Sequence, residues 1–561
     1  MTSISRFRRP GQIRVAVFFF GIFLHAGIAQ PQTPPQPTTT IRSQTELVLV
    51  PVVVNDKSGA HVHNLRLEDF AVEENGKRQK VATFEEVIAG PRSVSSQAKD
   101  QYTNYLPDDT SARRLTIILL DLVNTPYLTQ QYARDELLKA LSATLNTEDP
   151  KALLTLTGSG VRVLHGFTTD PAVLAAALRK ANGDTARPGG VDADSLASDD
   201  AALKSFGAPV NTEWNMLHER SVIEMTLASF RDLAKAFEGV PGRKALIWAS
   251  AGFPFLVHNV PAARSGTQFP AAPRVPLLGA EVGTEMFYSY EKTLRMLSSA
   301  NIAIYSVDVR PMVNSAYRDL APDPSGQRSY GLWAAQNHAA STTTLVKFAL
   351  ETGGKPWVDA SDLARGFSLA LDDSRSYYLL GYYRDRTATK PGWHQLLVKV
   401  AHSGADVRAR AGFLIPEPSA TPADQASDTE LALSSPLDYT AVPLTLRLEP
   451  ATEVAGKEQV NFVLTLPPGG FTIDAEDSNH AELEITAAVV DDQGKVKAAR
   501  PQLLNMHLKP ESVAKINAGG LVYHNSFDIP VGDYTGRFVV RDLLSGRIGS
   551  ISAPLKKATT P

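Results

Sequence analysis

Cysteine is absent from all 561 residues of the sequence. This absence excludes disulfide bridges, thiolate metal sites and cysteine nucleophiles, but it does not assign a compartment. An excess of positive charge is also missing, because the formal net charge is -3, and we therefore expect no nucleic-acid partner. No stretch beyond the N-terminal region is long and apolar enough to span a bilayer, so we expect no membrane span in the mature chain.

The N-terminus has the three parts of a secretory signal peptide. Arginines precede an apolar run from Val15 to Leu24, and the small residues Gly27 and Ala29 fit a cleavage before Gln30. A single membrane anchor is the alternative, but the apolar run is short for the ~20 residues that a span needs. We therefore predict that residues 1–29 are a signal peptide and that the chain is exported to the periplasm or the extracellular space.

The next segments lead to the main domain. Residues 30–42 are rich in Pro, Gln and Thr and are predicted to be a disordered spacer. Residues 43–88 have the pattern of a small β module, with a hairpin signal at Asn75 and Gly76. This module is too small for us to expect independent stability, so it should pack on the following domain. Residues 89–112 are polar and turn-rich, which predicts a linker.

The most informative stretch runs from Arg113 to Thr125. Within it, Leu115 to Leu120 form a run that is apolar except for Thr116 and ends at Asp121. A strand that is apolar on both faces belongs in the middle of a parallel sheet with helices on either side. Further strands, predicted at 152–157, 161–167, 245–249 and 302–307, alternate with predicted helices. The fold class of residues 113–376 is therefore α/β, with a doubly wound, mostly parallel sheet.

From Tyr377 onward the pattern is all-β. Residues 377–415 are predicted to be a β extension packed on the α/β domain, and residues 416–435 are predicted to be a linker. Short strands separated by turns at residues 436–557 predict a β-sandwich of immunoglobulin-like type.

Three stretches at predicted strand ends carry a resemblance to the von Willebrand factor type A fold, which is Rossmann-like. They are residues 119–126 (LLDLVNTP), 242–253 (GRKALIWASAGF) and 301–308 (NIAIYSVD). More closely, the chain resembles the secreted "VWFA-related" proteins of the Acidobacteria type. The blocks that carry this resemblance are Leu65 to Gly76, Tyr378 to Tyr382 and Val407 to Phe413. The resemblance covers roughly residues 46–416.

The resemblance implies a divalent-cation site, of which this chain keeps only part. Type A domains use Asp-x-Ser-x-Ser, a loop threonine and a second aspartate. Here Asp121 keeps the first position, Val123 and Thr125 replace the serines, and Ala249 to Gly252 lack the second aspartate. Three residues are candidates for the loop threonine, namely Thr168, Thr185 and Thr212.

Magnesium prefers octahedral oxygen ligands that include at least one or two carboxylates. The candidate ligands for Mg2+ or Mn2+ are therefore Asp121 and Thr125, in a degenerate site. We expect no cofactor. The alternative interpretation is that Asp121 caps a helix or holds the following loop by hydrogen bonds.

Other candidate sites have simpler interpretations. Asp308 and Arg310 are expected to form a salt bridge or loop anchor, and residues 158–160 a strand-joining turn, because no Gly-Lys-Ser/Thr follows. Ser250 lacks the Gly-x-Ser-x-Gly context of a nucleophile elbow. The tyrosines at 377, 378, 382 and 383 are expected to serve strand and core packing in preference to a recognition patch.

His61 and His63 alternate on one side of a predicted turn. They could touch a metal, but the neighbouring sequence contains no third ligand. Ordinary surface histidines are the commoner case.

These features predict an exported, non-catalytic protein that binds a protein or cell-surface ligand. No acid/base or nucleophile constellation indicates an enzyme, and nothing in the C-terminal β region supports a hydrolase. Binding would use the strand-end face and the predicted loops at 182–209 and 253–281. The alternative is a divalent-cation-dependent adhesin, in which a carboxylate from the partner completes the cation shell of Asp121 and Thr125.

Overall fold

The structure is a computed structural model. It describes residues 45–88, 101–105, 114–143, 149–180, 212–253, 280–310, 340–358, 362–373, 375–385, 390–415, 422–449, 452–454, 457–474, 477, 479–491, 494–529 and 532–555. The predicted signal peptide and spacer lie outside the described residues. None of the described helices is both long and apolar enough to cross a bilayer.

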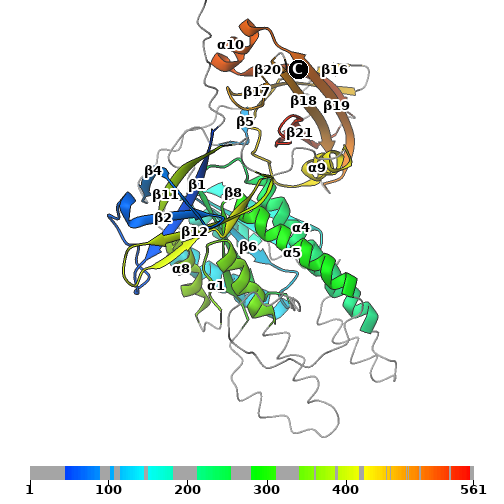
Figure 1. Ribbon diagram of the computed structural model, residues 1–561. Coiled ribbons are helices and arrows are strands. Elements are labelled where there is room, and N and C mark those ends of the chain that lie inside the picture. The colour runs from blue at the N-terminus through cyan, green and yellow to red at the C-terminus, as the bar shows by residue number, and fades with distance from the viewer. Residues whose placement is uncertain are drawn as a thin grey trace, which may run out of the picture. The chain divides into compact units, whose positions relative to one another are not determined.

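The protein is of mixed α/β type, with several antiparallel sheets and one mixed sheet (Figure 1). The mixed sheet has the order β10-β9-β6-β7-β8, in which β10, β9, β6 and β7 are parallel and β8 is antiparallel to β7. Its strands are β6 (Arg114–Asp121), β7 (Lys151–Thr157), β8 (Gly160–Thr168), β9 (Arg243–Ser250) and β10 (Ile302–Asp308). The expected interior parallel strand at Leu115 to Leu120 is therefore confirmed, because β6 lies between β9 and β7.

Helices cover both faces of the mixed sheet. Side chains alternate along a strand, so β6 buries Ile117 and Leu119 on one face and Ile118 and Leu120 on the other. The first face packs against α4, α5 and the helix at 340–351, and the second against α1, α2 and α8. In Figure 1, α4 and α5 lie side by side. The bounds are α1 (Tyr127–Ala143), α2 (Pro171–Lys180), α4 (Thr212–Ala236), α5 (Ala280–Ser299) and α8 (Leu363–Asp373).

The two β regions on either side of this domain in the sequence form one structure, which we call the N-terminal sandwich. Its sheets have the orders β13-β1-β11-β4 and β14-β12-β2-β3. The strands are β1 (Thr45–Asn55), β2 (Phe70–Glu74), β3 (Lys77–Gln79), β4 (Val81–Val87), β11 (Tyr377–Asp385), β12 (Gly392–Val400), β13 (Asp406–Ala409) and β14 (Gly412–Ile415), and a 3-10 helix, η1, spans Leu67–Asp69.

This arrangement differs from the sequence analysis, which treats residues 43–88 and 377–415 as separate regions. The physical reason is that a hairpin alone buries too little apolar surface, whereas interleaved strands enclose a common core. Val50 and Val52 of β1 pack in that core with Tyr378 and Tyr382 of β11. The predicted hairpin is present, since Asn75 and Gly76 join β2 to β3 with φ values of 49° and 77°.

The C-terminal region consists of two antiparallel sheets around one buried cluster. One has the order β16-β17-β15-β5 with β20 also paired to β17, and the other has the order β19-β18-β21-β22. Their strands are β5 (Gln101–Thr103), β15 (Thr445–Leu448), β16 (Thr452–Val454), β17 (Lys457–Leu466), β18 (His480–Val490), β19 (Val496–His507), β20 (Leu521–Ile529), β21 (Tyr534–Asp542) and β22 (Ile548–Leu555), and α10 spans Pro510–Gly519.

Two segments that the sequence predicts to be linkers contain regular elements. Strand β5 comes from residues 89–112, and α9 (Pro422–Ser434) comes from residues 416–435. Tertiary contacts explain both elements, because short polar segments gain most of their order from packing. Strand β5 pairs with β15, and Arg537 Nε donates to the Ala432 carbonyl of α9 over 2.9 Å.

We expect Asn104→Ala to lower the free energy of unfolding by about 1–3 kcal/mol, because it leaves buried polar groups unsatisfied. The Asn104 amide donates to the carbonyls of Tyr439 and Val442 and accepts from the Leu444 amide, over 2.6, 2.9 and 2.7 Å. Urea unfolding measures the change. The matched control is Asn525→Ala, at an exposed position of β20, where we expect a change within about 0.5 kcal/mol. Equal losses in both variants would show that β5 is not docked as described.

Candidate functional site at the carboxyl edge of the mixed sheet

Three strands of the mixed sheet end side by side in polar residues. Strand β6 ends at Asp121, β9 at Ser250 and β10 at Asp308. The parallel register places Leu120 opposite Ala249 and Ser250 opposite Asp308. We call these three residues and the turn at 122–125 the carboxyl edge.

Asp121 organises the carboxyl edge through five hydrogen bonds. Its Oδ1 accepts from the amides of Val123 and Asn124 over 3.1 and 2.9 Å. Its Oδ2 accepts from Asn124 Nδ2, Trp248 Nε1 and Ser250 Oγ over 2.8, 3.0 and 2.8 Å. The residue is only 2% exposed. Burial raises the pKa of the Asp121 carboxyl, and the hydrogen bonds from Asn124, Ser250 and Trp248 oppose that rise without cancelling it.

Thr125 is also occupied by protein contacts. Its Oγ1 accepts from the Ala251 amide over 3.2 Å, which ties the turn after β6 to the end of β9. Gln130 Nε2 donates to the Leu122 and Thr125 carbonyls over 2.8 and 2.7 Å. An ion at Asp121 and Thr125 would have to displace at least one donor. The hydrogen bonds of Asp121 and Thr125 agree with the alternative interpretation, in which Asp121 holds the following loop in place.

The other residues that the resemblance implies are not gathered at the carboxyl edge among the described residues. Val123 packs against the core cluster. Thr168 pairs with Lys151, the first residue of β7, and so lies at the opposite edge of the sheet. Thr185 lies outside the described residues, and only the backbone of Thr212, where α4 begins, is described.

Ser250 continues the network into the next turn. Its Oγ accepts from the Gly252 amide over 2.8 Å while donating to Asp121. Gly252 has a φ of +70°, and a Cβ there would lie 2.7 Å from the Ser341 carbonyl oxygen. Glycine therefore permits both the turn and the close approach of the helix at 340–351.

The expected anchor at Asp308 is confirmed. Arg310 Nε donates to Oδ1 over 2.8 Å, and its guanidinium also reaches Oδ2 over 2.5 Å. Arg310 additionally donates to Thr342 Oγ1 over 2.8 Å. This pair ties the end of β10 to the helix at 340–351.

One further expectation is confirmed, and a second is confirmed for three of its four residues. Residues 158–160 form the turn between β7 and β8, with Thr157 paired to Gly160. Tyr377, Tyr378 and Tyr382 are buried in cores, whereas Tyr383 is exposed.

The blocks that carry the family resemblance meet around one buried carboxylate in the N-terminal sandwich. Glu74 Oε2 accepts from the Tyr382 hydroxyl over 2.8 Å, and Oε1 lies 2.6 Å from His394 Nδ1. The His394 ring stacks on Phe413 at 5.3 Å. Residues from all three blocks therefore build one core contact.

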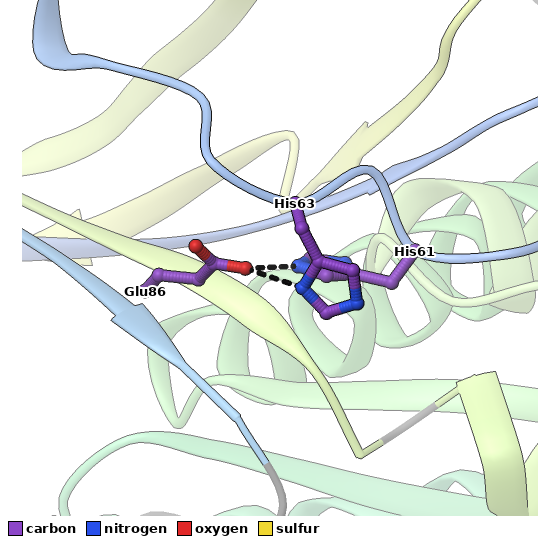
Figure 2. A group of neighbouring side chains, drawn as sticks. All are labelled: His61, His63 and Glu86. Carbon is purple, nitrogen blue, oxygen red and sulfur yellow. Dashed lines mark hydrogen bonds and ion pairs between the residues drawn. The ribbon is translucent and has the colours of Figure 1, made fainter.

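The structure also brings together a group that the sequence analysis missed. His61 and His63 lie beside Glu86 of β4, whose side chain points toward both rings (Figure 2). Spacing gives no signal for this neighbour, because Glu86 comes from another strand.

The comparisons with known proteins identify no family. No protein-family model matches the chain, and no curated protein matches it. Among solved structures, the TFIIH p34 N-terminal domain is similar over 47% of this chain and 99% of that chain, with 12% identity and a TM-score of 0.22. A glycosyl hydrolase family 2 member from Bacteroides cellulosilyticus is similar over 33% of this chain and 20% of that chain, with 10% identity and a TM-score of 0.16. TM-scores this low carry no argument about this protein.

Proposed function

We propose that the protein is an exported, non-catalytic binding protein whose carboxyl edge contacts a protein or cell-surface ligand. The observation that carries this proposal is the position of Asp121. Asp121 is the last residue of β6. Strands β7 and β8 lie on one side of β6 in the sheet, and β9 and β10 lie on the other side. Open α/β sheets bind ligands beyond the strand ends, at the point where the strand order reverses in this way.

The chemistry at the carboxyl edge supports binding in preference to catalysis. A hydroxyl nucleophile needs a base within hydrogen-bond reach. Ser250 Oγ does have a base within reach, the Asp121 carboxylate, but Ser250 is fully buried and that carboxylate already accepts four other hydrogen bonds. Thr125 Oγ1 accepts from the Ala251 amide. Both hydroxyls are therefore used to hold the edge in shape.

We further propose that the chain belongs with the secreted VWFA-related proteins that its sequence resembles. Two observations support this: helices cover both faces of a mostly parallel sheet, and Val72, Tyr382 and Phe413 from the three sequence blocks share one core. Export is supported by the signal-peptide pattern of residues 1–29. The predicted binding loops at 182–209 and 253–281 lie largely outside the described residues.

The cation-dependent adhesin that uses Asp121 and Thr125 is the less favoured proposal. Magnesium binding there would replace protein donors that already satisfy both carboxylate oxygens, at a buried site.

We expect Ser159→Arg to reduce capture of the partner at least about tenfold, because a misplaced charge in an interface costs several kcal/mol and about 1.4 kcal/mol is tenfold. Ser159 is exposed in the β7–β8 turn, which lies at the same end of the mixed sheet as the carboxyl edge because β7 runs parallel to β6. The experiment is a pull-down from an envelope extract of the producing organism, with captured proteins quantified by mass spectrometry.

The matched control is Ser526→Arg, which adds the same side chain at an exposed serine of β20. A protein retained by the wild type and by Ser526→Arg but lost with Ser159→Arg supports the proposal. Equal retention by all three forms, or nothing above an unrelated exported protein, contradicts it.

A further inference from the structure

The strongest group outside the carboxyl edge combines two histidines and a glutamate. His61 and His63 lie in the connection between β1 and β2, and Glu86 lies in β4. His63 Nδ1 is 2.8 Å and His61 Nε2 is 3.3 Å from Glu86 Oε1. All three candidate donor atoms lie within 4.8 Å of one another. In Figure 2 the carboxylate faces both rings.

His61 is an unsatisfied group aimed into this cluster. Its side chain is 10% exposed, yet neither ring nitrogen has a hydrogen-bond partner among the described residues, and the 3.3 Å contact of Nε2 with Glu86 is an ion pair only when the ring is protonated. The ring stacks on Tyr378 at 5.2 Å and meets the edge of His63 at 4.8 Å. Buried polar atoms normally have partners, so these orphaned nitrogens point to a ligand.

We propose that His61, His63 and Glu86 together bind one divalent metal ion, and that this ion is Zn2+. Two imidazoles and one carboxylate are a recurrent ligand set for zinc, with Zn–N distances of about 2.0–2.1 Å that bring tetrahedral donors to roughly 3.3 Å from one another. The His61–Glu86 separation already matches this, and the exposed His63 ring needs only a side-chain adjustment. Three protein ligands leave a fourth position for water or a group from a partner.

The supporting contacts fix the ligands in place. Glu86 Oε2 accepts from the Asn64 amide over 3.3 Å. The Tyr378 hydroxyl donates to the Val62 carbonyl over 2.7 Å and accepts from the Leu65 amide over 3.2 Å, which pins the segment that carries both histidines. Such outer contacts orient metal ligands and contribute to affinity. His63, with 52% of its side chain exposed, provides an entry path.

The donor atoms also favour zinc in particular, because two of the three residues offer imidazole nitrogens. Nitrogen donors favour zinc over magnesium or calcium.

The test is isothermal titration calorimetry of ZnCl2 into the full, chelator-treated chain without a histidine tag. We expect one saturable site per chain and no heat with MgCl2. His63→Ala and Glu86→Gln should each weaken zinc binding by at least about 100-fold, since residues that only orient ligands already contribute about 10–100-fold. Co2+ substitution should give a visible spectrum that both variants lose.

The matched control is His524→Ala, which removes another exposed histidine and should leave zinc binding unchanged. Near-UV circular dichroism checks that each variant is folded. If His63→Ala does not fold, His63→Gln replaces it. The proposal is overturned if the wild type shows no saturable zinc binding. It is equally overturned if zinc binds with unchanged affinity to the folded His63 and Glu86 variants.

Discussion

Arg408→Ala should lower the free energy of unfolding by about 3–5 kcal/mol, the usual effect of removing one partner of a buried ion pair. Arg408 of β13 binds Asp373 of α8 with two parallel hydrogen bonds, over 2.7 and 2.5 Å. The side chains are 8% and 7% exposed. Without the guanidinium, the Asp373 carboxylate keeps the 2.6 Å hydrogen bond from Asn55 Nδ2 and a hydrogen bond with the Tyr305 side chain. The loss would be measured by urea unfolding.

This loss should depend on pH. Burial acts to raise the pKa of Asp373, but the hydrogen bonds and charge of Arg408 dominate and lower it below the ordinary value of 3.8. A folded-state pKa below the unfolded one means that the contribution is complete above that ordinary value and disappears as pH falls through the folded pKa. The difference between wild type and Arg408→Ala should therefore shrink in strong acid.

Two controls separate the ion pair from ordinary side-chain loss. Arg408→Met combined with Asp373→Leu should recover most of the stability, because it removes both charges and keeps the volume. Lys399→Ala breaks an exposed pair with Glu73 in the same sandwich and should cost no more than about 1 kcal/mol. A loss for Arg408→Ala as small as that of Lys399→Ala would contradict the described pair.

The parts of the fold that the sequence predicts well are those with a local cause. Ile117 to Leu120 are apolar at every position, and a strand covered on both faces buries them all. Asn75 and Gly76 tolerate positive φ, so the two turn residues themselves are enough to predict the turn. Asp121, the last residue of β6, is likewise recognisable in the sequence as the polar residue that ends an apolar run.

The parts that the sequence analysis misses depend on contacts between distant residues. Val48 pairs with Tyr382 although the whole mixed-sheet domain lies between them in the sequence. The N-terminal sandwich could therefore not be predicted from either segment alone. Glu86 comes close to His61 only because β4 pairs with β11, with Glu86 opposite Tyr378. Periodicity within one segment carries no information about such partners.

The candidate site shows the same division. The position of Asp121 was predictable, but its donors Trp248 and Ser250 lie far along the chain, on β9. Trp248 has the pattern of an ordinary core residue within an apolar run. Its indole nitrogen became relevant only when the parallel register placed β9 beside β6.

Asp121→Ala should lower the free energy of unfolding by about 3 kcal/mol or more, since each buried donor left without an acceptor costs about 1–3 kcal/mol. Trp248 Nε1 and Ser250 Oγ would lose their acceptor in a site that excludes water. Asp121→Asn should lose less, because its amide oxygen still accepts hydrogen bonds. Urea unfolding of the three forms provides the comparison.

The pH dependence and the response to magnesium distinguish an anchor from an ion ligand. Burial raises the pKa of Asp121 above the ordinary 3.8, so the wild type should lose stability as pH rises from that value through the folded pKa, and Asp121→Asn should lack this loss. If Asp121 is an anchor, millimolar Mg2+ should leave the melting temperature of the wild type unchanged. A magnesium-dependent rise in the wild type that is absent from Asp121→Asn would instead establish the cation site, because an ion that binds only the folded state stabilises it.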